Sequence, residues 1–149
     1  MELEKVNEYG LLYTLKGKMD NLKPLIFMAH QDVVPAPDAF RWKYPPFEAY
    51  YDGEWLWGRG SADCKSVLVG LMSVMEELLN QGYQSNRTII FSFGFDEETG
   101  GHRGAKNLAA RIEQKWGEDG AAIVLDEGGM GVQLKGSVAY ALPAVAEKG

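Results

Sequence analysis

The sequence has one cysteine, no run of basic residues and no apolar stretch near the roughly 18 residues of a membrane span. The single Cys64 excludes an internal disulfide and a zinc site built from several thiolates. With 15 basic and 21 acidic residues the net charge is −6, which argues against nucleic acid or an anionic membrane as partner. The first ten residues, MELEKVNEYG, lack the apolar segment of a signal peptide. What remains is an acidic chain long enough for one domain.

The most informative stretch is TIIFSFGFDEETGG, at residues 88–101. Its first eight residues are almost all apolar, β-branched or aromatic, which predicts a strand covered on both faces. Asp96, Glu97 and Glu98 follow where that strand would end. Ligands bind outside the carboxyl ends of the strands in open parallel sheets, so these carboxylates form a candidate metal or acid–base site. A solvated acidic loop is the alternative.

The rest of the chain alternates between strand and helix patterns. Strands are predicted at residues 9–16, 25–29, 55–57, 88–95 and 121–125 and twice within 132–145, and helices at 65–81 and 103–115. The order strand, helix, strand, helix, strand implies right-handed crossovers and a parallel sheet. We therefore predict an α/β fold in three layers, with a parallel-rich sheet and helices on both of its faces.

Several of these predicted elements carry polar side chains at the same edge of the sheet. The residues are His30, Asp32, Asp63, Glu97, Glu98 and Asp126. A lone histidine is often structural, and Asp63, just ahead of a helix, could be a simple N-cap. However, imidazole and carboxylate groups gathered at one edge suit zinc, and a ligating imidazole usually donates its other N–H to a carboxylate such as Asp32.

Two further features have uses that the residues leave open. Residues 35–52 form a long irregular segment with four prolines and six aromatic residues. Its aromatic side chains either seal this loop against the sheet or form a wall for a substrate. Asn86-Arg87-Thr88 matches a glycosylation sequon.

Four motifs together resemble the co-catalytic zinc peptidase family of aminoacylases and carboxypeptidases. They are MAHQDVVP, WGRGSADCKS, FDEETGGHRGA and VLDEGG, and they run in the family's order through nearly the whole chain. The sequence is most similar to the branch of vacuolar carboxypeptidase S and secreted N-acyl amino acid hydrolases. The resemblance implies two zinc ions and hydrolysis of an amide or peptide bond next to a free carboxylate, in a small peptide or N-acyl amino acid. It also implies a vacuolar or secreted location.

The resemblance also implies a role for each site residue. His30 and Asp126 would bind the first zinc, Asp63 would bridge both ions and Glu98 would bind the second. Asp32 would orient His30, and Glu97 would act as general base. The family uses either of two adjacent positions in this last motif, so Glu127 is the alternative to Asp126. A cis peptide bond is expected after Asp63.

The resemblance further implies that residues 1–149 are part of a catalytic domain, without its carboxyl-terminal segment or the lid and dimerisation domain. Family members complete the second zinc site with a histidine near the carboxyl end. Only His102 is available here, and it lies too close in sequence to Glu98. The chain is therefore expected to bind one zinc appreciably, the other weakly, and to be inactive by itself.

Two other functions are compatible with the residues. A non-catalytic remnant would keep the fold and bind metal weakly or serve as an interaction module. The missing histidine and lid favour this alternative, whereas the intact Glu97 argues against it. A magnesium-dependent phosphoryl-transfer protein would also place carboxylates at strand ends. His30 and the lack of a GxxxxGK loop argue against this second alternative.

Overall fold

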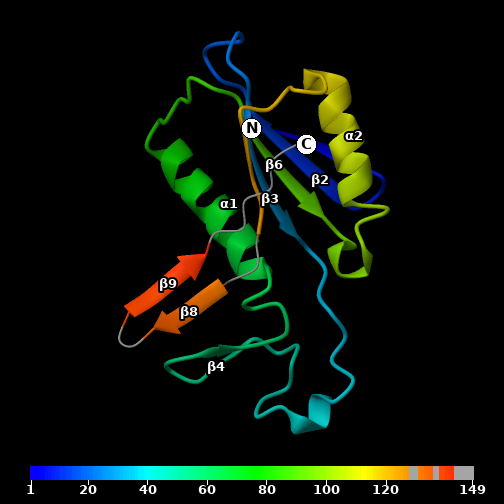
Figure 1. Cartoon of the computed structure of the whole chain (residues 1–149), viewed down its shortest axis with the longest axis vertical. Coiled ribbons are helices and arrows are strands. Elements are labelled where there is room, and N and C mark those ends of the chain that lie inside the picture. The colour runs from blue at the N-terminus through cyan, green and yellow to red at the C-terminus, as the bar shows by residue number, and fades with distance from the viewer. Residues whose placement is uncertain (128–130, 136–137, 143–149) are drawn as a thin grey trace.

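The computed structural model describes residues 1–127, 131–135 and 138–142, and its main feature is a five-stranded mixed sheet in the order β1-β2-β6-β3-β7 (Figure 1). The strands are β1 (Glu2–Val6), β2 (Gly10–Leu15), β3 (Leu25–His30), β4 (Tyr50–Tyr51), β5 (Leu56–Trp57), β6 (Ile89–Gly94), β7 (Ile123–Leu125), β8 (Gly131–Lys135) and β9 (Val138–Leu142). The helices are α1 (Lys65–Asn80) and α2 (Ala105–Trp116), with 3-10 turns η1 (Ala39–Arg41) and η2 (Glu97–Thr99). Strands β4 and β5, and likewise β8 and β9, form separate antiparallel pairs.

The three strands that lead to the candidate site are parallel, as predicted. Strand β6 pairs with β3 from Leu25↔Ile89 to His30↔Gly94. On its other side β3 pairs with β7, down to Phe27↔Leu125. All six residues of β6 are buried, which accounts for its nearly unbroken apolar sequence. The carboxyl ends of the three strands therefore lie at one edge of the sheet.

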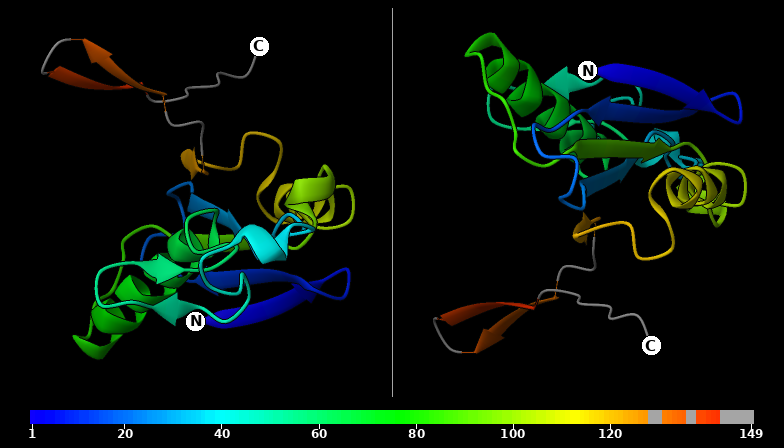
Figure 2. Two further views of the ribbon diagram at one scale, coloured as in Figure 1. Left: turned by 90° about the horizontal axis from the view of Figure 1, so that it is seen from below. Right: turned by 90° about the horizontal axis from the view of Figure 1, so that it is seen from above.

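The two long helices cover opposite faces of this sheet (Figure 2). On one face Met75 of α1 packs into a cluster with Phe91 and Phe93. On the other face Leu108 of α2 packs with Ile26 and Ile90. Successive residues of β6 therefore pack into different clusters, because successive side chains of a strand point to opposite faces of the sheet. The predicted three-layer arrangement is confirmed.

Strand β1 was not predicted from the sequence. It forms a hairpin with β2, from Glu2↔Thr14 to Val6↔Gly10, at the edge of the sheet. Three of the five residues of β1 are charged, and one of them, Glu4, receives hydrogen bonds from Arg111 and Lys115 of α2. The strand is thus held by its partner strand and by ion pairs with a helix more than 100 positions away, which no local pattern reveals.

The aromatic side chains of the long loop do not seal it against the sheet. Phe40 is 88% exposed, Phe47 69% and Tyr51 63%. Only part of the loop is tightly packed, where Tyr44 stacks on Tyr50 at 4.0 Å and meets Trp57 edge-on at 5.5 Å. Sealing was therefore the wrong alternative for most of these rings.

Among the described residues, no helix is both long and apolar enough to cross a membrane.

Candidate metal centre

The centre is built around His30, the last residue of β3, whose side chain is almost fully buried. Its Nδ1 lies 2.9 Å from the backbone oxygen of Asp32 and 3.3 Å from Asp32 Oδ1. A carbonyl oxygen can only accept a hydrogen bond, so Nδ1 carries a proton and donates it. This bond fixes the orientation of the ring and points Nε2 away from the core, toward the edge of the sheet.

Three carboxylates from three other segments face His30 Nε2. The distances are 3.0 Å to Asp63 Oδ1, 3.2 Å to Glu127 Oε1 and 3.8 Å to Glu97 Oε2. One group of possible ligand atoms, all within 4.8 Å of one another, comes from His30, Asp63, Cys64 and Glu127, and a second comes from His30, Glu97 and Glu98. Residues that are widely separated in sequence therefore converge on a single point.

The electrostatics of the cluster raise the pKa of both His30 and Glu97. Burial alone lowers the pKa of His30, but the hydrogen bond to Asp63 and the charges of Glu127 and Asp32 outweigh it, so the net shift is upward. For Glu97, partial burial is the main cause of the raised pKa, the His30 charge opposes it, and the nearby charges of Glu127 and Glu98 add to it. A carboxylate with a raised pKa accepts a proton more readily than an ordinary one.

Asp63 and Cys64 are joined by a cis peptide bond, as the resemblance implies. Cys64 is buried, and its thiol contacts the backbone of His30. Its Sγ accepts the N–H of His30 at 3.2 Å and donates to the His30 carbonyl at 3.7 Å. Burial is the main cause that raises the pKa of the Cys64 thiol to about 12, so the group is a neutral thiol. Sequence reasoning gave Cys64 no role; its position next to Asp63 was the only signal.

Asp32 holds the acidic loop as well as the imidazole. Its two carboxylate oxygens accept the backbone N–H groups of Glu97 and Glu98, each at 3.1 Å. The Glu98 carboxylate in turn accepts the N–H of Val34 at 3.1 Å. Asp96, the first acidic residue of the loop, serves a different purpose, because its oxygens accept the N–H groups of Arg103 and Gly104 ahead of α2.

The geometry favours Glu127 over Asp126 as the partner of His30. Glu127 belongs to the first ligand group, whereas Asp126 belongs to neither group among the described residues, and its Oδ1 accepts the N–H of Glu127 at 2.9 Å. The ligand role of Asp126 stays a prediction without geometric support. His102 is likewise in neither group. The N-cap alternative for Asp63 is not supported, because Cys64 caps α1 without a side-chain hydrogen bond.

The donor set fits a zinc ion. One imidazole nitrogen and two carboxylate oxygens within bonding reach of a common point are typical zinc ligands, and Glu97 stands beside them. The ring orientation set by Asp32 is the support such a ligand requires. Several carboxylates in this small volume repel one another, and a divalent cation would relieve that repulsion.

Comparison with known proteins gives one family. Residues 26–140 match the profile described as Peptidase family M20/M25/M40. The chain is 48% identical over its whole length to carboxypeptidase S of Saccharomyces cerevisiae and covers 27% of that protein. It is 36% identical over 98% of its length to the N-fatty-acyl-amino acid synthase/hydrolase PM20D1 of Bos taurus and covers 29% of that protein.

A solved structure shares the arrangement of the chain. The M20 family metallo-carboxypeptidase Sso-CP2 of Sulfolobus solfataricus superposes with a TM-score of 0.68 at 25% identity, over 87% of this chain and 28% of that one. The chain therefore spans only 24–29% of the length of the curated relatives it matches.

Proposed function

The chain belongs to the peptidase family M20/M25/M40, and from this premise we propose that it forms the metal-binding part of a zinc-dependent hydrolase. The bond cleaved is an amide or peptide bond next to a free carboxylate, in a small peptide or an N-acyl amino acid. The names of the relatives, a carboxypeptidase and an N-fatty-acyl-amino acid synthase/hydrolase, support this substrate class.

The observation that carries the proposal is the convergence on His30 Nε2. Asp63 and Glu127 approach it to 3.0 and 3.2 Å, and Glu97 stands slightly farther away at 3.8 Å. His30, Asp63 and Glu127 would hold one zinc ion and, as the resemblance implies, Asp63 and Glu98 would hold a second. Bound zinc lowers the pKa of a water molecule from 15.7 to about 7, which supplies a nucleophile at neutral pH.

Asp32 and Glu97 have the remaining roles in this proposal. Asp32 holds the proton on His30 Nδ1 and keeps Nε2 free as a ligand. It also fixes the backbone of Glu97 and Glu98. The Glu97 carboxylate takes the proton of the attacking water and returns it to the nitrogen of the leaving amine. Its raised pKa suits both halves of that transfer.

We also propose that the 149-residue chain turns over no substrate by itself. The second zinc is assigned only Asp63 and Glu98, and among the described residues these two share no ligand group, because Glu98 is grouped with His30 and Glu97 instead. Catalysis with paired metals requires both ions to be held while the substrate is positioned. A vacuolar or secreted location, implied by the resemblance, completes the proposal and is tested by cell fractionation of the tagged protein.

Metal analysis combined with an activity assay tests the proposed function. The purified chain is dialysed against zinc, magnesium and a mixture of the two, and the bound metal is measured. The proposal expects zinc to be retained and magnesium to be lost. Hydrolysis of N-acetyl amino acids is then followed for the chain alone and for a longer protein that contains it. Retention of magnesium, or inactivity of the longer zinc-loaded protein, would contradict the proposal.

A further inference from the structure

The chain contains one N-glycosylation sequon, Asn86-Arg87-Thr88, and the proposed chemistry gives it no role. The sequon lies in the segment between α1 and β6 and ends just before Ile89, the first residue of β6. A glycan is bulky and polar, so the folded protein can carry one only where the asparagine side chain reaches the surface. The structure of this segment therefore decides whether the motif can be used.

The backbone of the sequon is held against the turn that follows β2. The carbonyl oxygen of Asn86 accepts the N–H of Met19 at 3.0 Å, and the hydroxyl of Thr88 accepts the N–H of Gly17 at 3.2 Å. The two segments approach each other closely, since a Cβ added to Gly17 would lie 2.5 Å from the Asn86 oxygen. The sequon is thus a firmly placed part of the surface.

The side chain of Asn86 takes no part in this network. Asn86 is exposed, and its amide group makes no hydrogen bond with any other residue in the part of the chain that the structure describes. A glycan attached to the amide nitrogen would therefore break no contact of the fold. It would also cover the neighbouring Met19, which is 44% exposed, and shield this apolar side chain from water.

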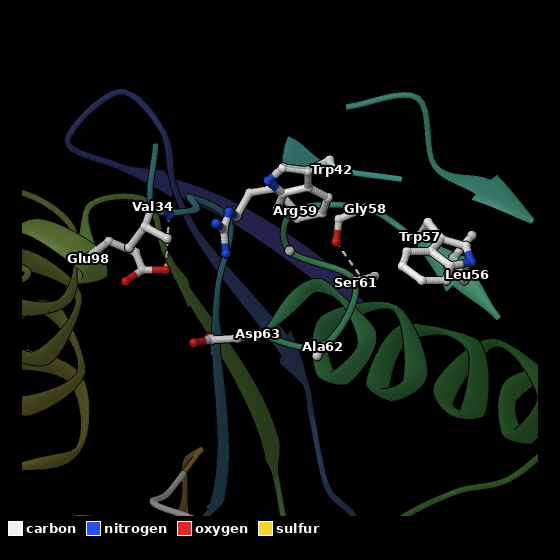
Figure 3. A pocket seen from close by; sticks show the side chains of 11 residues that line it. Val34, Trp42, Leu56, Trp57, Gly58, Arg59, Ser61, Ala62, Asp63 and Glu98 are labelled. Carbon is white, nitrogen blue, oxygen red and sulfur yellow. Dashed lines mark hydrogen bonds between the residues drawn. The ribbon is translucent and has the colours of Figure 1, made fainter. Parts of the chain in front are cut away.

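The sequon and the candidate metal centre lie at opposite ends of β6. The strand runs from Ile89, next to the sequon, to Gly94, next to the acidic loop, a distance of about 17 Å by the usual rise of a strand. Figure 1 shows the segment between α1 and β6 at the end of the sheet away from the arrowheads of β3 and β6. The cavity of about 320 Å³ that Asp63 and Glu98 line is at the other end (Figure 3). A glycan on Asn86 would leave that cavity open to substrate.

We infer that Asn86 is N-glycosylated, an inference that rests on the proposed function through its vacuolar or secreted location. The donor is an oligosaccharide whose anomeric carbon is linked to a polyprenyl diphosphate. The Nδ2 nitrogen of Asn86 forms a bond to that carbon while the bond from the carbon to the diphosphate oxygen breaks. The lipid diphosphate leaves with the electron pair, and Nδ2 gives one of its two protons to a base. Thr88 completes the motif that the transferring enzyme recognises.

The competing account is that these three residues occur together by chance and serve only the fold. Thr88 has such a role, because its hydroxyl accepts the Gly17 N–H. Two substitutions separate the accounts. Thr88→Ser keeps both the hydroxyl and the motif, whereas Asn86→Gln keeps an exposed amide and destroys the motif. If the motif occurs by chance, the segment carries no glycan in either variant or in the unchanged protein.

The test expresses a longer protein that contains the chain in yeast with its own targeting, beside the 149-residue chain behind an added secretory leader. Peptide-N-glycosidase converts a glycosylated asparagine to aspartate, and mass spectrometry of the Asn86 peptide digested in ¹⁸O water detects the conversion. We expect conversion in most molecules of both proteins, its loss in Asn86→Gln and its partial retention in Thr88→Ser. Asn80→Gln, at an exposed asparagine outside the sequon, is the matched control and should leave the conversion unchanged.

An unmodified Asn86 in the longer protein would overturn the inference. The leader-directed chain then shows the reason, because modification there means that the proposed location is wrong, and its absence there means that the sequon itself is not used. Hydrolysis of N-acetyl amino acids by the same longer protein separates this inference from the proposed function, and Asn86→Gln should keep the zinc-dependent rate. An active protein with Asn86 unmodified would refute only the glycosylation. An inactive zinc-loaded protein with Asn86 modified would refute only the hydrolase.

Discussion

Replacing Asp32 by alanine removes a carboxylate that joins three parts of the site. Its two oxygens accept the N–H groups of Glu97 and Glu98 at 3.1 Å, and Oδ1 lies 3.3 Å from His30 Nδ1. A hydrogen bond to a charged group contributes about 1.5 kcal/mol at the low end of its range, so two give about 3 kcal/mol. The side chain is 21% exposed, and relief of charge repulsion offsets part of the loss. We expect Asp32→Ala to lower the free energy of unfolding of the zinc-free chain by about 2 kcal/mol, which corresponds to a fall in Tm of roughly 4–8 °C.

Urea and thermal unfolding followed by circular dichroism measure this change. Asp32→Asn removes the same charge but keeps one acceptor oxygen, so it should fall between the unchanged chain and Asp32→Ala. Asp38→Ala is the control, because Asp38 makes only an exposed ion pair with Arg41 at 3.5 Å, and it should shift stability by less than about 0.5 kcal/mol. The reasoning is refuted if Asp32→Ala is no more harmful than Asp38→Ala, or if Asp32→Asn and Asp32→Ala are equally destabilised.

Three further predictions concern Glu4 at the edge of the sheet and Cys64 beside the site. Hydrogen bonds from Lys115 and Arg111 lower the pKa of Glu4 below 4.5. The Glu4 carboxylate therefore adds to the free energy of unfolding above pH 4.5, and this stabilisation is lost as the pH falls through the lowered pKa. Glu4→Gln should therefore lower the free energy of unfolding, measured in urea, by about 1 kcal/mol at pH 7 and leave it unchanged in strong acid. A loss that is independent of pH would contradict this prediction. The buried Cys64 thiol, whose pKa is about 12, should resist iodoacetamide at pH 8 in the folded chain and react in urea. Cys64→Ala should weaken zinc binding measured by calorimetry, because the thiol holds the backbone of His30; rapid native alkylation or unchanged zinc affinity would contradict that role.

The central parallel strands and their two helices could be predicted from the sequence, whereas the edge strand β1 and the packing of the aromatic loop could not. Apolar strands and the helices between them are enough to give parallel β3, β6 and β7 with a helix on each face, because periodicity and crossover handedness are local rules. Strand β1 depends on distant ion pairs to α2, and the exposure of Phe40 and Phe47 depends on what lies next to the loop. Neither can be read from a local pattern.

The same limit applies to the site. His30, Asp63 and Glu97 follow or precede recognisable elements, so their convergence could be predicted. The choice between Asp126 and Glu127 could not, because β7 ends at Leu125 and the alternation of a strand no longer fixes which way each side chain points.

Calorimetric zinc titration of the purified chain, with matched variants at the adjacent acidic residues, tests the central claim most directly. The account predicts one dominant binding event, which His30→Ala abolishes and Glu127→Ala weakens at least tenfold, a loss of about 1.4 kcal/mol or more. Asp126→Ala and Glu97→Gln should each change the affinity less than about threefold, because neither residue is assigned to the zinc ion. Loss of the dominant event in Asp126→Ala, together with its survival in Glu127→Ala, would contradict the ligand set proposed for this chain.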